Sequence, residues 1–252
     1  MADEAKSLIN LVPQSIDNAA KNITDAPTKN MGQTMADLWF LIFGGISQAA
    51  DKRRAQYNIE LNKFKEELTA SLDKVPEENR QEPSSHIVLS SLEEAKFCVE
   101  EEELRELFVS LLTSATDSTK TVHPSFASII RQMSPNDAFL IREFKRIYKY
   151  PLCNIKYVDS KGYFRVLFKN LVLIGRGTEH ERSVSVSSLI RLGLLETPHG
   201  EFINDPPQYA PFKRTTAYLS QLAIYPANQL QIEELKIQLT PLGRLFLECC
   251  VS

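Results

Sequence analysis

Apolar residues recur every three or four positions through the first quarter of the chain, which is the spacing of one helical face. The first apolar stripe covers residues 5–24, where Pro13 is expected to kink the helix or mark a new start. A second stripe predicts a helix from about Met31 to Leu72. At about 1.5 Å per residue this helix would be roughly 60 Å long, so it needs a partner or a membrane beside it.

An uncharged run of thirteen residues lies between Asp37 and Asp51, and three basic residues at 52–54 follow it. Thirteen helical residues span about 20 Å, whereas the hydrocarbon core of a bilayer is about 30 Å thick. Over residues 30–50, however, Asp37 is the single charge, and the basic residues stand where a cytoplasmic flank is expected. Two interpretations stay open for residues 1–54: a hairpin packed in a soluble core or dimer interface, and a membrane hairpin.

In the membrane interpretation, this hairpin belongs to an oligomeric channel. Charged side chains at such a depth must face water, so Asp17 and Asp37 would line the pore and favour cations. Trp39, Phe40 and Phe43 would face the lipid.

A central helical region is predicted over residues 55–133. Ser91 and Glu94 have the spacing of a capping box, which predicts a helix from there to about Thr116. The acidic run at residues 100–103 is interpreted as a solvated face rather than a metal site, because consecutive residues point around a helix instead of converging.

A new pattern begins at Ser134, which is the predicted N-cap of a helix with Pro135 in its first turn and Asp137 near its positive end. Residues 156–174 carry aromatic and branched residues around an Asp-Ser-Lys-Gly turn, which predicts a β-hairpin. Residues 183–197 predict a short helix that stops at Gly193 and is followed by a strand.

Residues 234–250 predict a strand and then a last helix, capped by Thr240. Helix, strand, strand and helix around a tri-helical unit are typical of a winged helix, here over residues 134–252 with residues 198–233 inserted at the wing. The predicted fold is therefore mainly α with a smaller β component. It comprises an N-terminal helical hairpin and long helix, a central helical bundle and a C-terminal winged-helix-like α+β domain.

A winged helix suggests duplex DNA, but the predicted recognition helix carries only Arg182 and Arg191 as cations. The candidate ligand-binding cations of the domain are Lys161, Arg165, Lys169, Arg176, Arg182, Arg191, Lys213 and Arg214. The aromatic residues Tyr163, Phe164, Tyr209 and Phe212 are interleaved with them. Phosphate pairing and base stacking by such residues suit a single strand or a nucleotide. A scattered, solvated surface is the alternative interpretation.

The composition of the 252-residue chain, with 43% hydrophobic and 24% charged residues, allows one large or two small globular domains. Its net charge of -3 gives no overall attraction to phosphate, so nucleic-acid binding would need a local basic patch. The four cysteines, Cys98, Cys153, Cys249 and Cys250, form no CxxC pair and predict free thiols in a reducing compartment. The N-terminus has no basic segment of a signal peptide, so most of the chain is expected in the cytoplasm.

Enzyme signatures are sparse. His123 before Pro124 is interpreted as a helix cap, and residues 175–180 lack the spacing and the Lys of a phosphate loop. No nucleophile-base pair or metal-ligand spacing is found in the sequence, so we expect neither catalysis nor a cofactor.

Several stretches together resemble the abortive-infection alpha proteins of bacterial phage defence. They are KRRAQYNIELNKFKEEL, VPEENRQEP, EEEELRELFVSLLTSATDS, VHPSFASIIRQMSPNDA, and LIRLGLLE with LTPLGRLFL. The resemblance runs from about residue 37 to the C-terminus and implies a suicide or growth-arrest effector. Some such proteins are similar to the effector of Hailong-type systems. In these systems a short single-stranded DNA, made by a partner nucleotidyltransferase, holds an oligomeric membrane channel shut.

The resulting hypothesis is a homo-oligomeric channel in the bacterial cytoplasmic membrane, with most of each chain in the cytoplasm. It would be gated by a single-stranded DNA oligomer or nucleotide signal, with a nucleotidyltransferase as partner. The alternative is a soluble winged-helix regulator that binds duplex DNA as a dimer.

Overall fold

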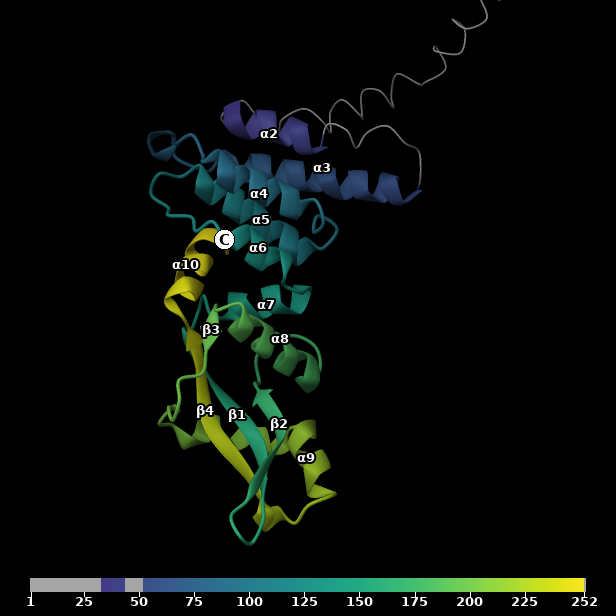
Figure 1. Ribbon diagram of the computed structural model, residues 1–252, viewed down its shortest axis with the longest axis vertical. Helices are drawn as coiled ribbons and strands as arrows, with labels where there is room; N and C mark the ends of the chain where they lie inside the picture. Colours follow the sequence, from purple (N-terminus) through teal and green to yellow (C-terminus); the bar gives the residue numbers. More distant parts are fainter. Residues whose placement is uncertain (1–32, 44–51, 252) are drawn as a thin grey trace, which may run out of the picture. The chain divides into compact units, whose positions relative to one another are not determined.

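The computed structural model describes residues 33–43 and 52–251, which divide into two compact units (Figure 1). The helical unit extends to Arg131, and the α+β unit begins at Gln132. This division lies two residues before the predicted boundary at 133/134. Most of the predicted 1–54 hairpin, including Asp17, lies outside the described residues.

Five α-helices form the described part of the helical unit. They are α2 (Gln33–Phe43), α3 (Lys52–Leu72), α4 (Ser85–Ala95), α5 (Glu102–Ala115) and α6 (Phe126–Arg131), with a 3-10 turn η4 (Glu77–Asn79) after α3. Helix α3 packs on α5, and α4 packs on α2, α5 and α6. The predicted long helix over residues 31–72 corresponds to α2 and α3, and the segment between them, residues 44–51, lies outside the described residues.

The inner face of α2 is aromatic. The Trp39 ring centroid lies 4.6 Å from that of Phe43 and 5.6 Å from that of Phe64 on α3. All three side chains are completely buried, and each such burial contributes about 1.5–3 kcal/mol to stability. Helix α2 is therefore attached to the unit through its aromatic residues.

The predicted single helix from Ser91 to Thr116 is wrong. Ser91 lies inside α4, where its hydroxyl donates to the carbonyl oxygen of Ile87 at 2.7 Å. A serine can make this bond to the residue four positions earlier within a helix, so its spacing to an acidic residue did not identify a cap. A second helix, α5, starts after Glu101, and two residues of the acidic run stand in its first turn, where the helix dipole favours them.

The α+β unit has three longer helices around a four-stranded sheet. Its elements are α7 (Pro135–Glu143), β1 (Lys149–Val158), β2 (Phe164–Leu171), α8 (Glu179–Arg191), β3 (Leu195–Glu196), η5 (Pro206–Gln208), η6 (Ala210–Arg214), α9 (Thr216–Leu222), η7 (Ala227–Gln229), β4 (Leu230–Leu239) and α10 (Pro241–Cys250). The strand order is β2-β1-β4-β3, and neighbouring strands of this sheet pair antiparallel. Together the described residues are mostly helical with one sheet, so the mainly α prediction with a smaller β component is confirmed at this level.

The helix ends of this unit follow the local signals in the sequence. Ser134 and Asp137 form a reciprocal capping box at the start of α7. Thr240 accepts a hydrogen bond from the Gly243 N–H at 2.9 Å and caps α10. Gly193 ends α8 with φ of 74°, a left-handed conformation that suits glycine. All three predictions are confirmed.

The segment between β3 and β4 covers one face of the sheet. Tyr209 and Phe212 lie in it and are buried together with Cys153 and Ile155 of β1. The strands on either side of this insertion pair with each other, as a wing would. Between α7 and α8, however, the chain forms the β1–β2 hairpin, where a tri-helical unit would have its second helix.

Candidate nucleic-acid interface

The predicted turn at the tip of the β1–β2 hairpin is held by its own aspartate. Asp159 Oδ1 accepts hydrogen bonds from the backbone N–H groups of Lys161 at 2.8 Å and Tyr163 at 2.9 Å. Gly162 has φ of 84°, so it supplies the left-handed position of the turn. The tip is thus ordered by local bonds alone, and it lies at the end of the sheet far from β3 (Figure 1).

Two adjacent aromatic side chains are exposed at this tip. Tyr163 is 74% exposed and Phe164 is 64% exposed, and Phe164 begins the edge strand β2. An exposed apolar patch can mark an interaction site, and two adjacent rings form a small patch of this kind here. Such rings can stack with nucleic-acid bases of any sequence, because every base has a π-face.

A lysine accompanies the Phe164 ring. Val166 is the register partner of Lys156 and Phe164 that of Val158, which places these four residues on one face of the hairpin. The Lys156 ammonium lies 4.5 Å from the centroid of the Phe164 ring, within cation–π range. A base stacked on Phe164 would therefore have a cation close by.

Lys156 is positioned by a polar group on β4. Its ammonium donates to Glu233 Oε1 at 2.5 Å, and the Asn154 amide donates to Glu233 Oε2 at 2.7 Å. Burial alone would raise the pKa of Glu233, but these two hydrogen bonds outweigh it and lower the pKa below its ordinary value. Glu233 therefore stays ionised and keeps the lysine side chain in place.

The opposite face of the hairpin carries Arg165, which pairs in register with Tyr157. Its guanidinium lies 5.9 Å from the ring centroid of Tyr225 and donates to the hydroxyl of that residue. Tyr225 in turn packs 4.9 Å from Tyr157. The insertion thus supports an exposed arginine at the base of the aromatic tip.

The hairpin is locally basic in a chain of negative net charge. Between residues 156 and 169 there are four cations and one carboxylate, a local charge of +3. The carboxylate belongs to Asp159, whose oxygen is already bound to the backbone of the turn. Arg165 and Lys169 are four strand residues apart, or about 13 Å at roughly 3.3 Å per residue.

The other predicted cations do not gather at the hairpin. Arg176 lies with its guanidinium 4.0 Å from the centroid of the Phe139 ring on α7. Arg191 donates to the Gln132 side chain at 3.0 Å. Lys213 and Arg214 are exposed on η6. Of the eight predicted cations, the structure brings Lys161, Arg165 and Lys169 together on one hairpin.

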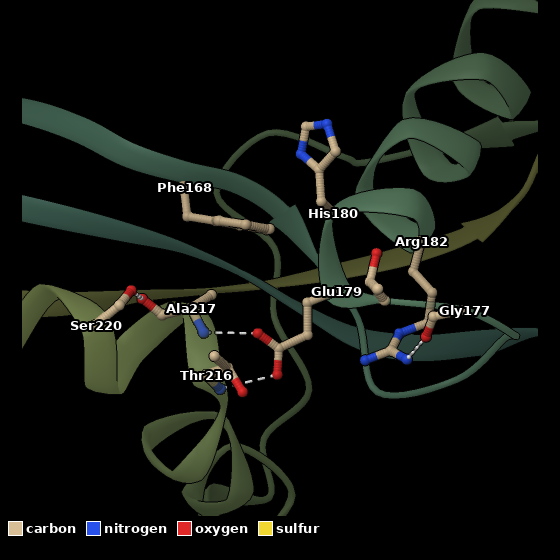
Figure 2. Close-up of a pocket in the computed structure, with 9 residues that line it drawn as sticks. Phe168, Gly177, Glu179, His180, Arg182, Thr216, Ala217 and Ser220 are labelled. Atoms are coloured by element: carbon tan, nitrogen blue, oxygen red, sulfur yellow. Dashed lines mark hydrogen bonds between the residues drawn. The ribbon is translucent and has the colours of Figure 1, made fainter.

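Arg182 lines a hollow between the start of α8 and α9, which has a volume of about 510 Å³ (Figure 2). Its guanidinium donates to the backbone carbonyl oxygens of Gly177 at 2.7 Å and Val172 at 3.3 Å. The arginine therefore fixes the loop that leads into α8, and these bonds engage donors that a phosphate would otherwise use.

The carboxylate of Glu179 lines this hollow. Glu179 accepts hydrogen bonds from the backbone N–H groups of Thr216 at 2.9 Å and Ala217 at 2.6 Å, at the first turn of α9 (Figure 2). Figure 2 shows the His180 ring directed away from these atoms. An anion entering here would meet the charge of Glu179, so the exposed hairpin is the better candidate for a nucleic-acid site.

The residues predicted to face a pore or lipid differ in exposure. Asp37 is exposed on α2, and Phe40 is 63% exposed beside the exposed Leu41. Trp39 and Phe43 are buried in the helical unit. None of the helices described within residues 33–43 and 52–251 combines the length and the apolar character needed to cross a membrane.

The four thiols are buried, and no disulfide joins them. Burial, with a smaller contribution from Glu234, raises the pKa of Cys153 to about 12, so this thiol is a poor nucleophile at neutral pH. Within the described residues there is also no group of three or more potential metal ligands from His, Cys, Asp and Glu.

Two residues of the hairpin site are absent from the sequence prediction. Lys156 precedes the predicted turn by three residues, and strand alternation could have placed it on the Phe164 face once the register was known. Tyr225 lies 60 residues from Arg165 along the chain, and no local pattern connects the two. Conversely, the predicted aromatic partners Tyr209 and Phe212 are buried in the core under the sheet.

Comparison with known proteins gives one result. The model of the family described as abortive infection alpha matches residues 56–250, which is most of the chain. No curated protein and no solved structure matches this chain significantly.

Proposed function

Because this chain belongs to the abortive infection alpha family, and hence to proteins of anti-phage defence, we propose that it is an effector controlled by single-stranded nucleic acid bound at the β1–β2 hairpin. The observation that carries this proposal is the exposed pair Tyr163 and Phe164 on a segment of local charge +3. A short single-stranded DNA oligomer is the proposed ligand.

The physical argument joins two contributions. Stacking of a base on an aromatic side chain contributes about 1–3 kcal/mol and tolerates any sequence. Lys161, Arg165 and Lys169 would add phosphate contacts, whose strength falls as salt rises because counterions are released on binding. Neither contribution needs the groove of a duplex.

Duplex DNA suits this unit less well. The exposed positions of α8 are occupied by His180, Glu181, Val184, Ser187 and Arg191, whereas a major-groove helix needs several donors that can reach base edges. Its first turn also carries two glutamates, which would oppose phosphate. The soluble duplex-binding regulator is therefore the less favoured function.

In the full proposal the effector acts as an oligomeric channel in the bacterial cytoplasmic membrane. The ligand would bind more tightly to the closed or to the open state, and this difference in affinity would shift the population between them. The exposed Phe40 and Leu41 on α2 support a membrane contact near the uncharged run of residues 38–50. A partner nucleotidyltransferase would supply the single strand.

Binding of oligonucleotides by the purified full-length protein tests the ligand. Fluorescence anisotropy at two salt concentrations should show a single strand bound more tightly than the duplex of the same sequence, with affinity falling at the higher salt. Equal or tighter binding of the duplex would favour the regulator, and no salt-sensitive binding of either would exclude the sensor.

Membrane fractionation tests the location separately. The wild type should sediment with membranes, and Phe40→Glu should shift protein into the supernatant, because a buried charge in lipid is costly. If both variants stay in the supernatant, the channel is excluded while nucleic-acid binding can still hold.

A further inference from the structure

The turn that joins α7 to β1 exposes five successive side chains. Lys145, Arg146 and Lys149 are exposed cations, and between them Ile147 is 53% exposed and Tyr148 is 65% exposed. Three cations around two large apolar side chains form a compact surface, which we name the 145–149 turn. It is distinct from the predicted cations and from the hairpin site.

The 145–149 turn is anchored at both ends. On the strand side, the Leu239 N–H of β4 donates to the Tyr148 carbonyl oxygen at 3.3 Å. On the helix side, the Tyr150 hydroxyl donates to the carbonyl oxygen of Glu143 at 2.9 Å, and the Tyr150 ring packs 5.1 Å from that of Phe144. The exposed apolar side chains are therefore presented by an ordered backbone.

The three cations of the turn outnumber the carboxylates around it. Residues 144–150 contain no acidic residue, and Glu143 precedes them. Across the sheet, Lys149 pairs in register with Gln238, and the Gln238 amide donates to Glu196 at 2.8 Å. Glu196 thus lies two strands away from Lys149, with Gln238 between them.

We propose that the 145–149 turn is a contact site for an anionic membrane surface. Ile147 and Tyr148 would enter the boundary between lipid headgroups and acyl chains, where tyrosine is favoured, while the three cations would meet the anionic headgroups. Charge complementarity selects an anionic surface. The aliphatic Ile147 favours lipid over nucleic acid, because it has no π-face on which a base could stack.

The two sites of the α+β unit lie at opposite ends of β1. Lys149 begins this ten-residue strand and the hairpin tip follows its last residue, so about 30 Å separates them at roughly 3.3 Å per residue. Nucleic acid at the hairpin and lipid at the turn therefore use different residues. The proposal for the turn does not depend on the proposal for the hairpin.

A fluorescent residue within the turn gives a direct test in the full-length protein. The chain has one tryptophan, Trp39, which is buried, so Tyr148→Trp adds a second reporter at an exposed position. Its emission should shift to shorter wavelength with vesicles of phosphatidylcholine and phosphatidylglycerol and stay unchanged with phosphatidylcholine alone. An emission that does not respond to the anionic vesicles would overturn the proposal.

Charge removal tests the cations. Arg146→Gln/Lys149→Gln should weaken binding to the anionic vesicles about 25-fold, since each cation near such a surface accounts for about a fivefold change. Lys213→Gln/Arg214→Gln is the matched control, with the same charge change at two exposed positions of the same unit, and should bind as the wild type does. Circular dichroism should show all variants folded.

Two results would contradict the membrane contact. One is vesicle binding by Arg146→Gln/Lys149→Gln that equals the wild type. The other is loss of binding to a single-stranded oligonucleotide in this variant with vesicle binding retained, which would assign the turn to nucleic acid.

Discussion

The two units of this protein use their charges in opposite ways. Residues 1–131 contain 21 acidic and 14 basic residues, a net charge of -7, whereas residues 132–252 contain 11 acidic and 15 basic residues, a net charge of +4. The modest total of -3 conceals this asymmetry. The excess of positive charge is therefore confined to the α+β unit.

Arg105, a cation of the helical unit, is buried in its interior. Arg105 on α5 is 4% exposed and bonds to Glu60 at 3.0 Å, to Glu67 at 3.0 Å and to the carbonyl oxygen of Val99 at 2.9 Å. Burial opposes the charge of Arg105, but its carboxylate partners outweigh burial and raise its pKa. By contrast, the hairpin of the α+β unit keeps Lys161 and Arg165 exposed. The buried cation of the helical unit links helices, whereas the exposed cations of the α+β hairpin can be reached by a ligand.

Removing the buried cation should have the largest effect. Arg105→Met leaves Glu60 and Glu67 without their shared partner, so we expect the helical unit to lose about 3–5 kcal/mol of unfolding free energy. Urea denaturation measures this loss. Lys63→Met removes an exposed partner of the same Glu60 and should cost much less, because exposed ion pairs contribute little. Equal stability of Arg105→Met and the wild type would show that the buried network is dispensable.

Removing the exposed rings should affect binding and leave stability intact. Tyr163→Ala/Phe164→Ala is expected to weaken single-strand binding by about 30-fold or more, since the two rings would each stack a base and each stacked base is worth about 1–3 kcal/mol. Anisotropy titration measures the change. Phe97→Ala removes an exposed ring of the acidic unit and serves as the matched control, which should bind normally. Equal losses in both variants would refute a specific role for the hairpin.

Removing single cations should have a smaller effect that depends on salt. Lys161→Gln should lower affinity for every single-stranded sequence alike and reduce the slope of log affinity against log salt by about 0.7. Lys213→Gln, which changes an exposed lysine outside the hairpin, should keep the wild-type slope. A changed slope in Lys213→Gln with none in Lys161→Gln would move the phosphate contacts away from the hairpin.

The smallest effect concerns alkaline pH and the helical unit. Burial, with the nearby charge of Glu100, raises the pKa of Tyr57 from 10.0 to about 12. The unfolded chain therefore loses the Tyr57 proton at a lower pH than the folded protein does. The contribution of neutral Tyr57 to the unfolding free energy is fully present below about pH 10 and is lost as the pH rises to about 12. Urea midpoints at pH 9 and pH 11 should therefore differ less in Tyr57→Phe than in the wild type. An unchanged difference would show that Tyr57 does not titrate as proposed.

Local signals predicted the ends of elements well. The capping box of Ser134, the stop at Gly193 and the Asp-Ser-Lys-Gly turn each depend on bonds within a few residues, which the sequence displays directly. Ser91 shows the limit of such signals, because its hydroxyl can serve a cap or bond within a helix. The local sequence thus shows that a side chain can bond to the nearby backbone, but it does not show whether that residue stands at the end of a helix or inside it.

Tertiary packing determines which aromatic side chains are buried and which are exposed. Tyr163 and Tyr209 have similar sequence surroundings near cations, yet one is exposed at a turn and the other is buried under the sheet by the inserted segment. On α2, Trp39 and Phe43 are four residues apart and share the buried face, whereas Phe40 lies outside it. Helical spacing allowed that distinction, but only the packing of α3 and α4 shows which face is covered.

Hydrogen–deuterium exchange on the full-length protein can locate the proposed binding of single-stranded nucleic acid at the β1–β2 hairpin. With a saturating thymidine oligomer, amides of residues 156–169 should gain protection while those of α5 remain unchanged. Protection confined to α8, or none anywhere in the α+β unit, would show that the hairpin is not the binding site.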